Sequence, residues 1–185
     1  RAQLDARAKA APAIEAKAES TTVVENELYR ITFSNKGGEA VSWILKKKPS
    51  GGTFRDDDGK PLEIIHEQAA AKFGYPLSLY TSDAALNGKL AKALYVPSAT
   101  GSLAPPAKLT FKYSEGSLTV TKTFTFDESY VIHADVEVTR DGQPVRSYLM
   151  WPGGFGDQDD SYGYASAQID TNISGKTEHL SQKKI

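Results

Sequence analysis

The stretch SLTVTKTFTF, residues 117–126, followed by SYVIHADVEV, residues 129–138, decides the fold class of this chain. In both runs apolar and polar residues alternate with period two, which is typical of β-strands with one buried face. Asp, Glu and Ser at 127–129 are turn-forming residues, so the two runs predict an antiparallel hairpin. Lys122 interrupts the apolar positions of the first run. We expect it near a sheet edge, or with its apolar stem buried and its ammonium group in solvent.

The same alternation recurs along the rest of the chain, separated by turns rich in Gly, Pro, Asn and Asp. Further strands are expected at 27–35, 39–48, 62–66, 76–81, 93–97, 108–115, 144–151 and 164–170. After residue 22, the one helical segment we expect is a short turn at 82–92. Many antiparallel strands without alternating helices predict an all-β fold, a large antiparallel β-sandwich. Ten side chains should be buried in it: Tyr29, Ile31, Phe33, Trp43, Leu118, Val120, Phe124, Ile132, Val136 and Val138.

The N-terminal segment differs in composition from the rest of the chain. Residues 1–22 are rich in Ala and charged residues and contain no aromatic residue. This composition favours helix but offers little apolar surface to bury, so we expect a tether leading into a β-sandwich domain at 23–185. An amphipathic membrane-surface helix is the alternative, but only Leu4 and Ile14 could form its apolar face.

Composition excludes several classes of protein. With 22 basic and 23 acidic residues among 185, the formal net charge is −1, so we expect no nucleic-acid partner. The absence of cysteine excludes disulfides and thiol chemistry. No stretch is apolar enough to span a membrane. Because the chain starts at Arg1 and its one methionine is Met150, we expect a processed piece, with a membrane span of about 20 residues just upstream in the full protein.

No motif for catalysis, metal binding or cofactor binding stands out. His133, Asp135 and Glu137 share one strand face and could in principle hold a metal, but a polar outer face is the simpler interpretation. The spacing of Asp56–Gly59 does not fit an EF-hand loop, so we expect a turn there. A cation near Asp157, Asp159 and Asp160 is another alternative, and the same caution applies to it. We therefore predict no catalytic residues, no metal site and no cofactor.

The segment MWPGGFGDQDDSYGYA, residues 150–165, combines aromatic residues with four glycines. Aromatic side chains on a glycine-rich loop form a plausible recognition surface. The candidate contacts to a partner or client are Trp151, Phe155, Tyr162 and Tyr164. The alternative is that these residues only cap an open end of the sandwich.

Several phrases in order resemble a known family. VVENELYRITFSNKGGEAVSWILKKK (23–48), DDDGKPLEII (56–65) and SLTVTKTFTFDESYVIHADVEV (117–138) are similar to the periplasmic domain of bacterial YidC-type membrane protein insertases. The resemblance implies a supersandwich fold similar to that of galactose mutarotases, on the periplasmic side of the inner membrane. It also implies a non-enzymatic role in inserting and folding inner-membrane proteins, with the Sec accessory proteins SecDF and inserting clients as partners. The family's domain is longer, so we expect this chain to be truncated at the C-terminal end of the sandwich.

Two other functions stay open at this point. One is a secreted carbohydrate- or peptide-binding β-sandwich module. The other is a sugar mutarotase-like enzyme, which would need a general acid and a general base in one cleft, typically a His and a Glu. Because fold alone does not carry that activity and no such motif is visible, we favour the non-catalytic insertase domain.

Overall fold

The computed structural model describes residues 12–56, 58–154, 168–173 and 175–181. The predicted hairpin is present: β9 (Leu118–Phe126) and β10 (Ile132–Arg140) are antiparallel over nine residue pairs. β8 (Ala107–Glu115) pairs with the other side of β9, also over nine pairs. Two short strands, β6 (Val96–Pro97) and β11 (Gln143–Pro144), complete a five-stranded sheet in the order β11–β10–β9–β8–β6.

A second five-stranded sheet has the order β4–β3–β2–β1–β7. Its members are β1 (Thr21–Glu25), β2 (Tyr29–Ser34), β3 (Glu39–Leu45), β4 (Leu62–Glu63) and β7 (Gly101–Leu103). Its pairings are antiparallel except that of β1 with β7, which is parallel. The β2–β3 turn contains Gly37 and Gly38 at φ +70° and +58°, in the left-handed region that glycine tolerates best.

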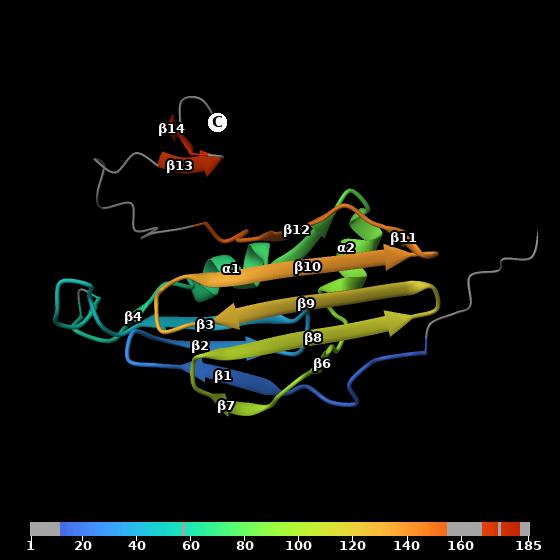
Figure 1. The fold of residues 1–185 in the computed structure, drawn as a ribbon, viewed down its shortest axis with the longest axis horizontal. Helices are drawn as coiled ribbons and strands as arrows, with labels where there is room; N and C mark the ends of the chain where they lie inside the picture. Colours follow the sequence, from blue (N-terminus) through green and yellow to red (C-terminus); the bar gives the residue numbers. More distant parts are fainter. Residues whose placement is uncertain (1–11, 57, 155–167, 174, 182–185) are drawn as a thin grey trace, which may run out of the picture. The chain divides into compact units, whose positions relative to one another are not determined.

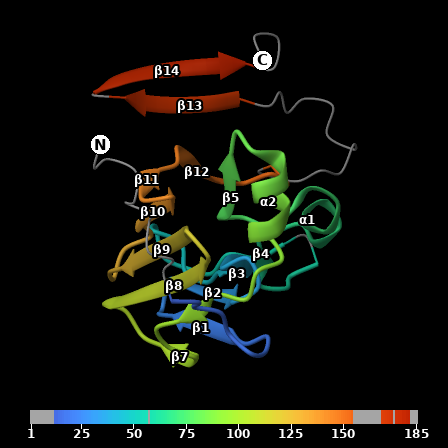
Figure 2. The same cartoon turned by 90° about the vertical axis from the view of Figure 1, so that its right-hand side faces the viewer.

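The two sheets lie face to face and enclose the core (Figures 1 and 2). Fully buried aromatic rings fill the space between them: Phe33 of β2 lies 5.1 Å from Phe124 of β9 and 6.1 Å from Phe111 of β8, centroid to centroid. Because rings from both sheets meet in one cluster, the predicted all-β sandwich is confirmed.

A two-stranded ribbon and two short helices lie along one side of the sandwich (Figures 1 and 2). The ribbon consists of β5 (Ser78–Thr81) and β12 (Ser147–Met150). Helix α2 (Ala84–Leu90) falls within the predicted helical turn, and the Asp83 side chain caps it by accepting from the Leu86 N–H at 3.0 Å. Helix α1 (Glu67–Phe73) was not predicted, because its buried residues, Ala69 and Ala70, form too small an apolar face to stand out.

The burial expected from the alternation is confirmed. Seven of the ten residues are buried, and Trp43, Ile132 and Val136 are half-buried and pack against the core. The expectation for Lys122 was wrong. Its side chain is 0 % exposed and points into the core, since three carbonyl oxygens there accept hydrogen bonds from its ammonium group.

The described part of the expected tether, from residue 12 to residue 22, pairs with the sandwich. Ile14 and Ser114 exchange backbone hydrogen bonds of 3.0 and 2.9 Å, and the Ala16 N–H donates to the Leu94 carbonyl. Strand β1 already begins at Thr21. Backbone groups dock this segment, which explains why its side-chain composition did not indicate the contact.

The described residues 168–173 and 175–181 belong to a separate compact unit. Within it, β13 (Gln168–Ile173) and β14 (Lys176–Ser181) form an antiparallel hairpin that overlaps the strand expected at 164–170.

Candidate functional site

The β5–β12 ribbon presents two tyrosines on its outer face. Tyr80 and Tyr148 are directly opposite each other in the register, and their exposed fractions are 45 % and 46 %. Their neighbours Leu79 and Leu149 form the next pair and pack against the core. Because successive residues of a strand point to opposite faces, the leucines fix the ribbon to the sandwich and leave the tyrosines outside.

Arg146 extends this outer face. Its guanidinium carbon lies 5.4 Å from the centre of the Tyr148 ring, which is within cation–π range. Tyr and Arg are enriched where proteins bind one another, since they combine a large contact area with polar ends. We refer to Tyr80, Tyr148 and Arg146 as the ribbon surface.

The predicted contact residue Trp151 follows the ribbon directly and points inward. Its ring lies 5.4 Å from that of Trp43 of β3, with 40° between the ring planes, and both side chains are half-buried against the core. The structure therefore gives Trp151 a packing role. The other candidates, Phe155, Tyr162 and Tyr164, lie outside the described residues.

The chain after Trp151 runs closely over helix α1. A β-carbon at Gly153 would lie 3.5 Å from that of Ala69, and one at Gly74, where the helix ends, would lie 3.3 Å from the Pro152 ring. The residues that follow β12 therefore pack closely against α1, and this packing supports the ribbon.

The ribbon surface was not predicted from the sequence, although the two strands carry a signal for it. In SLYT (78–81) and SYLM (147–150), tyrosine alternates with leucine, which identifies an aromatic outer face on each strand. What the alternation could not reveal is that the two strands, which are more than 60 residues apart, pair with each other and bring the tyrosines together.

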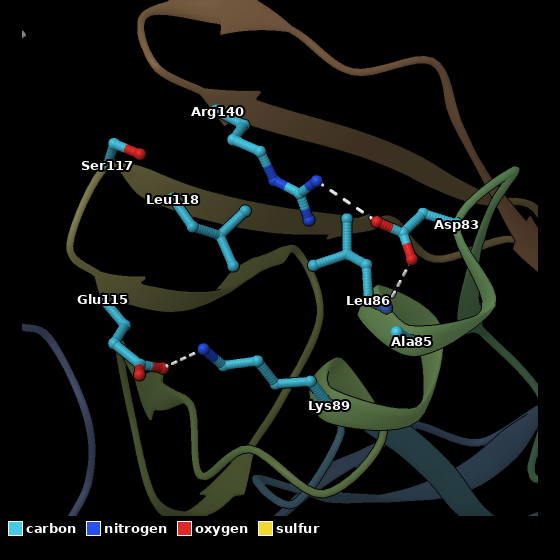
Figure 3. Close-up of a pocket in the computed structure, with 8 residues that line it drawn as sticks. All are labelled: Asp83, Ala85, Leu86, Lys89, Glu115, Ser117, Leu118 and Arg140. Atoms are coloured by element: carbon cyan, nitrogen blue, oxygen red, sulfur yellow. Dashed lines mark hydrogen bonds and ion pairs between the residues drawn. The ribbon is translucent and has the colours of Figure 1, made fainter.

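A small polar cavity of about 260 Å³ lies between α2 and the ends of β8, β9 and β10 (Figure 3). Two ion pairs line it: Asp83 and Arg140 are 3.1 Å apart, and Glu115 bonds Lys89. The pKa of Asp83 lies below its usual value because the Leu86 N–H and Arg140 donate to its carboxylate. The pKa of Glu115 is lowered by Lys89 and by the Tyr113 hydroxyl. Since each of these four charged side chains already has a partner, the lining of this cavity offers a ligand no unpaired charge.

His133, Asp135 and Glu137 all lie exposed on the outer face of β10, as the simpler interpretation predicted. Among the described residues, no group of three or more His, Asp or Glu side chains is close enough to hold a metal ion. Over the same part of the chain, no helix has the length and apolarity to cross a membrane.

Comparison with known proteins identifies the family. No curated protein sequence matches the chain. A family model described as the YidC periplasmic domain matches residues 21–151, from the first strand to the tryptophan that ends the ribbon segment. The match covers both five-stranded sheets, both helices and the ribbon. The chain therefore belongs to the YidC periplasmic domain family.

Proposed function

We propose that this chain is the non-catalytic periplasmic domain of a membrane protein insertase, on the periplasmic side of the bacterial inner membrane. It assists the insertion and folding of inner-membrane proteins by contacting partners, namely the Sec accessory proteins SecDF or inserting clients. Family membership supports this proposal, as do the ion pairs that neutralise the polar cavity beside α2.

The observation that carries the proposal is the exposed tyrosine pair of the ribbon. Tyr80 and Tyr148 stand side by side with Arg146 over one ring, on a ribbon whose opposite face is held in the core. A rigid aromatic surface loses little conformational entropy when a partner binds, which favours affinity. We propose this surface as the contact. A contribution of Phe155, Tyr162 and Tyr164 to partner binding stays a prediction from the sequence.

Trp151 is the less suitable position for a test, because truncating it would remove its packing against Trp43 as well as any contact. The tyrosines can be changed with less damage, since both are almost half exposed. The test is a double variant, Tyr80→Ala with Tyr148→Ala, in the full-length insertase. The matched control is His133→Ala with Glu137→Ala, on the exposed outer face of β10.

Tagged protein is purified from detergent-solubilised membranes, and the SecDF and client recovered with it are quantified. Two tyrosines at the centre of an interface contribute enough binding free energy that truncating both should lower the affinity for the partner by about tenfold or more. The tyrosine variant should recover about tenfold less SecDF or client than wild type, and its thermal unfolding temperature should stay close to that of wild type. The control variant should recover as much SecDF or client as wild type. Equal recovery by both variants would refute the ribbon surface as the contact.

A further inference from the structure

Lys122 lies at the centre of β9 with its whole side chain inside the sandwich. Its ammonium nitrogen is 2.7 Å from the Gly37 carbonyl oxygen, 3.2 Å from that of Gly38 and 2.9 Å from that of Leu77. An ammonium group has three protons to donate, so these three carbonyls satisfy it completely. The Tyr95 ring, 5.6 Å away, adds a cation–π contact.

The three acceptors belong to two segments that are otherwise far apart in the chain. Gly37 and Gly38 form the β2–β3 turn, whereas Leu77 is the residue immediately before β5 of the ribbon. One side chain from the first sheet thus binds the second sheet and the base of the ribbon at a single point.

The backbone at Leu77 is shaped for this contact. Its φ is +65°, a conformation that residues with a β-carbon rarely adopt. In this conformation its N–H donates to the Met150 carbonyl of β12 at 2.7 Å, while its own carbonyl accepts from Lys122. The preceding carbonyl, that of Pro76, accepts from the Ala40 N–H of β3 at 3.0 Å. Two hydrogen bonds therefore tie the base of the ribbon to the sandwich, and one of them has a charged donor.

Two titratable groups face the ammonium group: Glu39 at the start of β3, which is 8 % exposed, and Tyr95, which is fully buried. Burial lowers the pKa of Lys122 to about 8, and the negative charge of Glu39 opposes this shift. Burial likewise raises the pKa of Glu39 to about 7, against the attraction of Lys122. The carbonyl oxygens favour the charged form of the lysine, so the ammonium group is present at neutral pH.

We infer that Lys122 is a positioning residue for the ribbon surface: its ammonium group holds the base of the β5–β12 ribbon against the β2–β3 turn. The role as a ribbon anchor rests on geometry alone, and its consequence for partner binding rests on the proposed function. A buried ammonium group that loses one of its three carbonyl acceptors pays a large free-energy cost. The base of the ribbon, which supplies one of these acceptors, therefore has one strongly preferred position.

The test compares Lys122→Met, which keeps the length of the side chain but not its donors, with Lys112→Met on the exposed face of β8 as control. Amide hydrogen exchange is measured in the folded proteins for residues 78–81 and 147–150, and for β1 and β2 as reference. Loss of a hydrogen bond from a charged donor should speed exchange in the ribbon by about ten- to hundredfold relative to the reference strands. The two tryptophans, Trp43 and Trp151, should also shift their emission to the red as their contact loosens.

If Lys122→Met accelerates amide exchange equally in the ribbon and in the reference strands, the variant has lost stability in general, and the inference is overturned. The native protein supplies a second measurement if that variant does not fold. In nitrogen-15 spectra, the ammonium protons of Lys122 should exchange slowly and at the rate at which the ribbon amides open. Exchange as fast as that of exposed lysines would equally overturn it. Neither measurement involves a partner, so failure of the proposed function would leave both results unaffected.

Discussion

Phe124 offers the most direct test of the core. Its side chain is 0 % exposed, and its ring lies 5.1 Å from that of Phe33 in the facing sheet and 6.2 Å from that of Phe111 in the neighbouring strand. Phe124→Ala removes a whole buried ring and leaves a cavity between the two sheets. Such truncations cost about 3–5 kcal/mol, of which the aromatic contacts account for roughly 0.5–1.5 kcal/mol each.

The assay is urea unfolding followed by the fluorescence of Trp43 and Trp151. With a denaturant slope of about 2 kcal/mol per molar, a loss of about 4 kcal/mol lowers the unfolding midpoint by about 2 M urea. Domains of this size are typically stable by about 5–15 kcal/mol, so the variant should still fold in buffer.

The control is Thr125→Ala, the next residue of β9, whose side chain is exposed on the opposite face. It should change the free energy of unfolding by less than about 1 kcal/mol. A loss below about 1 kcal/mol for Phe124→Ala, or equal losses for the two variants, would show that the register assigned to β9 is wrong.

Three further predictions concern the buried polar groups and the β2–β3 turn. Since burial raises the pKa of Glu39 to about 7, the folded state holds this proton more tightly than the unfolded state, and stability should fall as pH rises from about 4.5 to about 7. Glu39→Gln should remove this fall in thermal unfolding between pH 4 and pH 8, and an unchanged pH profile would contradict the assignment. Gly38→Ala should cost more stability than Gly116→Ala in the same urea assay; both have φ near +60°, but an added β-carbon meets the Phe111 ring at 3.3 Å at the first position and open space at the second. The buried Tyr29 hydroxyl has no hydrogen-bond partner among the described residues, so calorimetry of Tyr29→Phe should show equal or higher stability, and a clear loss would reveal a partner for the hydroxyl.

The candidate site was only partly predictable. The aromatic and glycine-rich composition of residues 150–165 predicted Trp151 as a partner contact. In the structure its side chain points inward and packs against Trp43. The exposed pair Tyr80 and Tyr148 depends on a pairing between distant strands. Sequence alternation shows which residues share a face of one strand, but not which second strand lies beside it.

The sequence by itself determined the strands and their faces. The period-two alternation of 117–126 and 129–138 identified the central hairpin and the inward residues such as Phe124, because side-chain direction in a strand is a local property of the backbone. Only the tertiary structure decided the position of Lys122. The rule that a lysine keeps its ammonium group in solvent holds unless the interior supplies acceptors, and here three carbonyls from two distant segments converge on it. This convergence of carbonyl groups depends on how the whole chain packs, so no local sequence pattern around Lys122 could predict it.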